Sequence, residues 1–154
     1  MARKTDWYRD AVVYQIYPLS FMDLNNDGYG DIPGVISKLD YLKELGVTAI
    51  WFSPLYPSPW KDYGYDVADY RAIHPAFGTM EDFDRLMEEC RKRGIRVIMD
   101  MVLNHTSDQH PWFQAALADK HSKYRDYYII RPGRRRGEKL LPPTNWTSCF
   151  TGPA

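Results

Sequence analysis

Three short apolar runs, separated by segments with helical periodicity, constrain the fold of this chain more than any other feature. The runs cover residues 12–17, 47–52 and 96–103 and are rich in β-branched side chains. They are too short for helices and too continuously apolar for a sheet with one solvated face, so they predict parallel strands buried on both faces. Strand, helix, strand, helix, strand is the pattern of right-handed βαβ units, and the predicted fold class is α/β.

The segment between the second and third runs predicts an amphipathic helix with clear ends. Thr79 can cap its start, and Asp82, three residues on, completes a capping box. Apolar side chains then recur at i, i+3, i+4 and i+7 from Phe83 to Cys90, which predicts one buried face. Gly94 follows and is expected to end the helix.

The rest of the chain predicts fewer regular elements. The same periodicity in residues 35–45 predicts one further helix. After residue 104 the alternation of strands and helices stops, although residues 111–118 predict a short helix. Residues 119–154 predict irregular structure outside the sheet, and the basic stretch at 131–139 predicts a solvated loop.

Composition excludes several classes of protein. Of the 154 residues, 44% are apolar, and twenty Lys and Arg balance twenty Asp and Glu. A net charge of zero provides no global attraction to nucleic acid, so no nucleic-acid partner is expected. No membrane span and no signal peptide are expected, because no apolar run has the required length. The two cysteines, Cys90 and Cys149, predict no disulfide framework, and we expect a cytoplasmic protein.

The segment after the first run carries oxygen-bearing side chains at alternate positions around a glycine. Hard Ca²⁺ takes several oxygen ligands from one tight loop, so this spacing predicts a Ca²⁺ site. A complete EF-hand is excluded, because Gly34 occupies the twelfth position, where that motif has Glu. The alternative is an Asx-rich turn that binds nothing. The candidate ligands are Asp23, Asn25, Asp27, Tyr29 (through its backbone carbonyl) and Asp31.

The segments after the second and third runs carry the other polar candidates. Residues 53–66 contain three prolines and alternate Tyr and Trp with Asp, a combination that suits a sugar but also a structural loop. Asp100 lies within the third run, Asn104 and His105 follow it directly, and strand alternation predicts that Asp100 and Asn104 share one face. An Asp within an apolar strand is costly unless it is paired, so its role is either functional or a structural hydrogen bond.

Together these segments resemble glycoside hydrolase family 13, the α-amylase family, and within it the branch of α-glucosidases, oligo-1,6-glucosidases and trehalose synthases. The motifs are AVVYQIYPLSFMDLNNDGYGDIPG at 11–34, GYDVADYRAIHPAFGTMEDF at 64–83 and DMVLNHTSDQHPWF at 100–113. The resemblance implies a partial (β/α)8 TIM barrel. Residues 1–104 would supply its first three βα units, and residues 105–154 would begin a domain inserted after strand 3.

The resemblance also implies a retaining glycosidase acting on α-glucosidic bonds of short oligosaccharides. By position, Asp62 would bond the outer hydroxyls of the terminal glucose and Tyr65 would stack beneath its ring. His105 would bond the same sugar near its 6-hydroxyl, and Asp100 and Asn104 would be support residues. The family's nucleophile and acid/base follow the fourth and fifth strands, so this chain alone is expected to be inactive. The aromatic residues expected to lie in the loop facing the sugar are Tyr56, Trp60, Tyr63 and Tyr65.

Three alternatives remain open at the level of sequence. A transglycosylating relative, such as a trehalose synthase or a sucrose isomerase, shares the same early motifs. A non-catalytic sugar-binding barrel would have kept the fold and lost the acid and the nucleophile. A free-standing calcium-binding domain would explain only one of the three polar segments.

Overall fold

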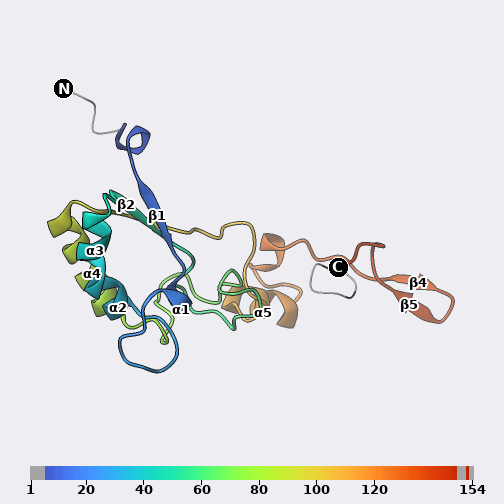
Figure 1. Ribbon diagram of the computed structural model, residues 1–154. Helices are drawn as coiled ribbons and strands as arrows, with labels where there is room; N and C mark the ends of the chain where they lie inside the picture. The colour runs from blue at the N-terminus through green and yellow to red at the C-terminus, as the bar shows by residue number, and fades with distance from the viewer. Residues whose placement is uncertain (1–5, 149–151, 153–154) are drawn as a thin grey trace. The chain divides into compact units, whose positions relative to one another are not determined.

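The computed structural model describes residues 6–148 and residue 152, and it consists of two compact units, Met1–Pro111 and Trp112–Ala154. The first unit contains a three-stranded parallel sheet in the order β1-β2-β3 (Figure 1). The three predicted strands are therefore confirmed. The elements of this unit are η1 (Trp7–Arg9), β1 (Val13–Ile16), α1 (Pro18–Phe21), α2 (Ile32–Ser37), α3 (Leu39–Glu44), β2 (Ala49–Phe52), α4 (Met80–Arg93) and β3 (Arg96–Met99).

The three strands differ in burial because only β2 has a partner on both sides. In the register of the sheet, Ala49 lies opposite Val13 on β1 and Arg96 on β3. Ala49, Ile50 and Phe52 of β2 are fully buried, whereas Val13 of β1 is 48% exposed. The prediction that all three strands are buried on both faces is thus wrong for the two outer strands, which are sheet edges within the described residues.

The third strand is shorter than its apolar run suggested. β3 ends at Met99, so the segment from Asp100 to Asn104 is not part of the sheet. Val102 is buried, while Asn104 is exposed. The expectation that Asp100 and Asn104 share one strand face is therefore wrong, because the alternation of a strand does not continue into this segment.

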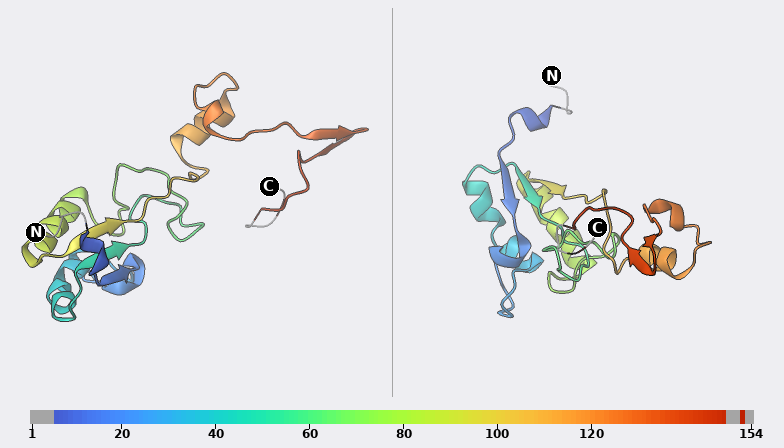
Figure 2. Two further views of the ribbon diagram at one scale, coloured as in Figure 1. Left: turned by 90° about the horizontal axis from the view of Figure 1, so that it is seen from above. Right: turned by 90° about the vertical axis from the view of Figure 1, so that its right-hand side faces the viewer.

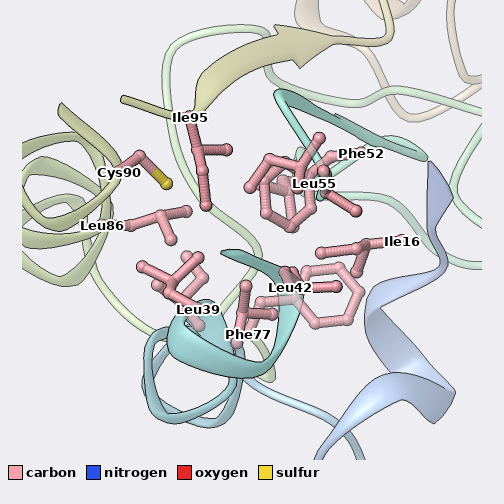
Figure 3. Close-up of a cluster of buried hydrophobic side chains, with 13 residues drawn as sticks. Ile16, Leu39, Leu42, Phe52, Leu55, Phe77, Leu86, Cys90 and Ile95 are labelled. Carbon is pink, nitrogen blue, oxygen red and sulfur yellow. The ribbon is translucent and has the colours of Figure 1, made fainter. Parts of the chain in front are cut away.

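The core of the first unit lies between the sheet and helices α2, α3 and α4 (Figure 3). Apolar side chains from the strands meet side chains from all three helices, and the best-covered ones are completely inaccessible to solvent. Burying one such side chain contributes about 1.5–3 kcal/mol. The labelled members in Figure 3 are Ile16, Leu39, Leu42, Phe52, Leu55, Phe77, Leu86, Cys90 and Ile95.

The helix predicted at 35–45 forms as two short helices. α2 ends at Ser37, whose hydroxyl donates to the Gly34 carbonyl at 2.6 Å. Lys38 then donates its amide to Val35 three residues back, and α3 begins at Leu39. A Ser hydroxyl that bonds an earlier carbonyl competes with the helical amide, which explains the break.

The helix predicted after Thr79 forms as expected. α4 begins with a complete capping box: the Thr79 hydroxyl accepts from the Asp82 amide at 3.1 Å, and the Asp82 carboxylate accepts from the Thr79 amide at 3.0 Å. The helix ends at Gly94, which adopts the left-handed conformation with φ of 70°. Arg93 near that end pairs with Asp40 of α3 at 2.7 Å and so links the two helices.

The second unit contains little regular structure. The predicted short helix is confirmed as α5, and Trp112 stacks on Tyr124 with ring centroids 5.6 Å apart. The basic stretch forms part of an exposed antiparallel hairpin rather than a loop, with Arg134 opposite Leu141 (Figures 1 and 2). Gly137, with φ of 61°, lies in the turn between the strands. The elements that include or belong to this unit are α5 (Pro111–Ala118), η2 (Arg125–Tyr127), β4 (Arg134–Arg136) and β5 (Lys139–Leu141).

Three expectations from the sequence have different outcomes. The first unit ends at Pro111, whereas the predicted domain boundary after residue 104 stays a prediction. Cys90 is a buried free thiol, and Cys149 lies outside the described residues. Within residues 6–148, no helix has the length and apolar character needed to cross a membrane.

Candidate functional site

Tyr65 brings together the polar segments that follow β2 and β3. Its hydroxyl donates to the Asp100 carboxylate at 3.2 Å, and its carbonyl lies 3.0 Å from His105 Nε2. These segments leave the carboxyl ends of neighbouring parallel strands, which is where α/β proteins place their functional groups. Three of the predicted site residues therefore form one hydrogen-bonded group.

The loop after β2 is shaped by Asp66, a residue that sequence reasoning did not single out. One carboxylate oxygen accepts from the Ser58 hydroxyl at 2.6 Å and from the Asp62 amide at 3.2 Å, while the other accepts from the Lys61 amide at 3.0 Å. The loop includes Trp60 at φ of 56°, a left-handed conformation that costs a non-glycine residue about 1–3 kcal/mol. The three bonds to Asp66 offset this cost and fix the position of Asp62.

Asp62 presents a carboxylate that the loop itself does not use. Its backbone is held at both ends, since its amide donates to Asp66 and its carbonyl accepts from the Tyr65 amide at 2.9 Å. Its side chain is half-buried, and no donor among the described residues bonds its oxygens. Such a carboxylate is available to accept hydrogen bonds from ligand hydroxyls.

The electrostatics of the site keep its phenols protonated. Burial raises the pKa of Tyr65, and the nearby Asp100 charge raises it further. Burial and the same carboxylate also raise the pKa of Tyr56. The Tyr65 hydroxyl therefore remains a donor to Asp100 throughout the physiological pH range, which keeps this carboxylate paired.

One hydrogen bond of His105 fixes the position of a ring proton. A backbone carbonyl only accepts, so the bond to the Tyr65 carbonyl requires a proton on Nε2. In the neutral ring Nδ1 is then the acceptor, and the Asn104 amide nitrogen lies 3.4 Å from it. Asn104 thus lies beside the other site residues, and its support role stays a prediction.

Further residues connect the two polar segments. The Tyr70 hydroxyl contacts the carbonyls of Val102 and His105, and Lys61 pairs with Asp108 at 2.8 Å. Sequence reasoning missed these contacts because they join residues more than thirty positions apart. The only signal was the density of Tyr and Asp in residues 62–70.

Two of the four aromatic residues of the loop, Tyr56 and Trp60, pack against neighbouring side chains. Trp60 stacks on His74, with centroids 4.4 Å apart and ring planes 19° from parallel, and Tyr56 is only 8% exposed. Tyr63 is 73% exposed, and Tyr65 is half-buried. Within the loop, Tyr56 is thus buried and Trp60 partly buried, and the expectation that the loop faces the sugar stays a prediction.

The candidate metal loop is organised by its own acidic and amide side chains. The Asp23 carboxylate accepts from the amides of Asn26 and Gly28 at 2.7 and 2.9 Å, and Asp27 accepts from the Tyr29 amide at 2.9 Å. Asp31 caps α2 by accepting from the Gly34 amide at 2.6 Å. These bonds leave free lone pairs on the carboxylates, since each carboxylate can accept about four bonds.

The fit of this loop to a cation can be judged by the atoms that it offers as metal ligands. All the candidate ligands are hard oxygen atoms, the class that Ca²⁺ prefers. The described residues contain no group of three or more His, Cys, Asp or Glu side chains arranged to hold a metal. The chemistry of the loop thus fits Ca²⁺, but its carboxylates do not by themselves form a complete ligand shell, and the amide of Asn25 and a backbone carbonyl would be needed.

Comparison with known proteins connects these features. The catalytic-domain model of the α-amylase family matches residues 15–154. The chain is 57% identical over 150 residues to the probable oligo-1,6-glucosidase 2 of Bacillus subtilis, an alignment that covers 97% of this chain and 26% of the relative. It is 54% identical over 149 residues to an α-glucosidase of Schizosaccharomyces pombe, covering 96% of this chain and 26% of the relative.

Solved structures of enzymes also match nearly the whole chain. The trehalose-6-phosphate hydrolase of Bacillus licheniformis superposes with a TM-score of 0.90 at 54% identity, covering 96% of this chain and 26% of that chain. A variant of the trehalulose synthase MutB also gives a TM-score of 0.90, at 53% identity and with the same coverage.

The chain spans about a quarter of the length of the curated relatives it matches. A catalytic domain of this kind implies a TIM barrel, and the parallel strands and covering helices agree with part of one. Because the family model matches most of its length, the chain belongs to the α-amylase family, glycoside hydrolase family 13.

Proposed function

We propose that this chain is the N-terminal part of a retaining, α-glucosidase-like enzyme that acts on α-glucosidic bonds of short oligosaccharides. The single observation that carries the proposal is the open Asp62 carboxylate beside the hydrogen-bonded group of Tyr65, Asp100 and His105. In this proposal residues 1–104 supply the first three βα units of the barrel. Residues 105–154 begin the domain inserted after strand 3.

Each residue of the group has a task that its geometry permits. Asp62 accepts hydrogen bonds from hydroxyls of the terminal glucose, and the Tyr65 ring provides an apolar surface for the C–H groups of that sugar. His105 Nδ1 accepts from a further hydroxyl in place of the Asn104 amide nitrogen, which lies 3.4 Å from it in this structure, because Nε2 is occupied by the Tyr65 carbonyl. Asp100 accepts from the Tyr65 hydroxyl and so fixes the ring. The nucleophile and the acid/base lie on segments outside residues 1–154.

A transglycosylating enzyme is the second candidate. Its support is the structural similarity to the trehalulose synthase MutB, which is as high as the similarity to the trehalose-6-phosphate hydrolase. The two candidates share the early part of the barrel, so this chain does not distinguish them. Product analysis of the natural protein that carries the chain does: release of free glucose indicates hydrolysis, and formation of an isomeric disaccharide indicates transfer.

A non-catalytic sugar-binding barrel is the third candidate, and it predicts binding without turnover. The direct test joins this chain to the C-terminal part of the Bacillus subtilis relative, replacing the matching quarter of that protein. We call this protein the fusion. A folded fusion that hydrolyses an aryl α-glucoside supports the proposal. A folded fusion that binds glucose but hydrolyses nothing would contradict the proposal, and glucose binding without turnover by the natural protein that carries the chain would support the non-catalytic alternative.

We also propose that Asp23, Asn25, Asp27, Tyr29 and Asp31 bind a structural Ca²⁺ ion. The support is the set of hard oxygen donors in one tight loop, held by the bonds described above. When bound, the ion would brace the loop between β1 and α2. It takes no part in the chemistry at the sugar.

The calcium proposal is tested by Asp27→Ala. We expect this variant to melt several degrees below the wild type in calcium buffer, because a ligand that binds only the folded state stabilises it. In chelator the two proteins should melt at nearly the same temperature. Leu24→Ala, a change of an exposed side chain in the same loop, is the control and should leave the calcium-dependent increase intact. Equal losses for Asp27→Ala in both buffers would remove the metal site.

A further inference from the structure

Tyr70 connects the two polar segments through the backbone on either side of a short turn. Its hydroxyl oxygen lies 2.6 Å from the Val102 carbonyl and 2.9 Å from the His105 carbonyl. One phenolic hydrogen is shared between these two acceptors. Within the described residues, no backbone amide donates to either carbonyl. The hydroxyl therefore ties both ends of the turn to the loop after β2, and the Ser107 amide, which donates to the Val67 carbonyl at 2.8 Å, adds a link just beyond the turn.

The ring that carries this hydroxyl is itself held by packing. It contacts the ring of Tyr56, with centroids 5.7 Å apart, and the ring of His110, with centroids 5.8 Å apart. It also packs against the small apolar cluster formed by Tyr56, Val67 and Val102. A side chain fixed on several sides loses little further freedom when it forms a hydrogen bond, so its hydroxyl is a rigid anchor.

The anchored turn leads directly to the imidazole of His105. The ring reaches the Tyr65 carbonyl at 3.0 Å only if the backbone of His105 stays where it is. His105 is exposed, so tight packing does not hold its ring. The position of the ring therefore depends on hydrogen bonds at Nε2 and at its own carbonyl, on the Asn104 contact at Nδ1, and on the bond from the Ser107 amide to Val67 that holds the backbone beyond it.

We propose that Tyr70 is a positioning residue that holds His105 in the orientation in which Nδ1 meets the sugar. This inference rests on the proposed function, because His105 is the proposed sugar contact. Tyr70 itself does not touch the sugar. Losing its hydroxyl weakens binding in the ground state and the transition state equally, which raises KM and leaves kcat nearly unchanged.

Tyr70→Phe and Tyr56→Phe form a matched pair of variants. Both remove one hydroxyl from the same aromatic cluster, but among residues 6–148 the hydrogen-bond partner of the Tyr56 hydroxyl is the sulfur of Met101 at 3.8 Å. In the fusion, Tyr70→Phe should raise KM for an aryl α-glucoside by about three- to tenfold, the effect of one lost hydrogen bond. Tyr56→Phe should change KM by less than about twofold. Equal changes in the two variants would overturn the inference.

A double-mutant cycle separates positioning from general damage. If Tyr70 acts through His105, then Tyr70→Phe should have almost no effect on KM once His105→Ala is present. Independent effects that multiply in the double variant would contradict the inference. Placing p-aminophenylalanine at position 70 restores a donor to the ring and should recover most of the affinity, which controls for loss of packing.

A second measurement needs no activity. Nitrogen NMR of the His105 ring in this chain or in the fusion reports which nitrogen carries the proton, and the structure requires Nε2. We expect Tyr70→Phe to shift this ring toward a mixture of the two neutral forms, while Tyr56→Phe leaves it unchanged. An unchanged spectrum in folded Tyr70→Phe overturns the inference. A fusion without activity but with the expected spectra overturns only the proposed function.

Discussion

At the scale of single residues, two aspartates of one loop have opposite environments. Both oxygens of Asp66 are occupied by donors of its own loop, whereas the Asp62 carboxylate bonds no donor within the described residues. The first organises its own loop, and the second is the proposed binding residue. The sequence shows both as Asp within a Tyr-rich segment, so only the three-dimensional contacts separate their roles.

The structural role of Asp66 predicts a loss of stability. Asp66→Ala removes three hydrogen bonds and leaves the Ser58 hydroxyl and two amides without their acceptor, so it should lower the free energy of unfolding by about 1–3 kcal/mol. Asp69→Ala is the control, because the exposed Asp69 side chain accepts, in the described part of the chain, one hydrogen bond, from the Arg71 amide at 2.8 Å. Urea unfolding measures both changes. If the two variants lost the same amount, Asp66 would not organise the loop.

Cys90 gives a prediction about pH. Burial raises the pKa of its thiol from 9.0 to about 11, although the neighbouring Arg93 opposes the shift. The folded state thus keeps the thiol neutral, and the stability this provides is complete below pH 9 and is lost as pH rises through about 11. At pH 8.5, alkylation of Cys90 should be at least about tenfold slower in the native protein than in urea. Mass spectrometry of the Cys90 peptide separates it from Cys149, and similar rates in both conditions would disprove its burial.

At the scale of elements, the helix with the strongest local signals was the most predictable. For α4 the Thr79 cap, the apolar face and Gly94 all predict the same helix, and the helix forms between these two ends. The helix predicted at 35–45 has the same apolar period but divides at Lys38. The hydroxyl of Ser37 bonds a carbonyl there, a contact that depends on the local backbone and that periodicity does not reveal.

The capping box of α4 predicts a measurable contribution to stability. Thr79→Ala removes the acceptor of the Asp82 amide and should cost about 1 kcal/mol in urea unfolding. Thr79→Ser keeps the hydroxyl and should cost only a few tenths of that amount. A loss of the same size in both variants would show that the methyl group of Thr79, rather than its cap, is responsible.

The candidate site was predictable from the sequence only in part. Proximity of Tyr65, Asp100 and His105 follows from their place after neighbouring parallel strands, and the structure confirms it. The inward packing of Trp60 and the bridge made by Tyr70 depend on which ring faces which turn. Tertiary contacts determine these ring positions, so they cannot be predicted from the composition of the loop.

At the scale of the whole molecule, the sheet and its helices form an open structure. Val12 and Val13 at the β1 edge are 52% and 48% exposed, and parallel sheets normally cover such edges and faces. The curated relatives are about four times as long as the aligned chain, so in the proposed enzyme the rest of the barrel would cover this surface. The cytoplasmic location and the absence of a nucleic-acid partner stay predictions from composition.

The central claim is that this chain supplies the sugar-binding part, and not the reacting groups, of an α-glucosidase-like enzyme. The most direct test is kcat/KM for an aryl α-glucoside, measured for the chain alone, for the fusion and for two fusion variants. The chain alone should be inactive and the fusion active. Asp62→Ala should lower kcat/KM of the fusion at least about a hundredfold, since a charged hydrogen-bonding group contacting the sugar is lost. Asp69→Ala in the same loop should stay within about twofold. Turnover by the chain alone that a change within residues 1–154 abolishes, or a folded and active fusion indifferent to Asp62→Ala, would contradict the claim.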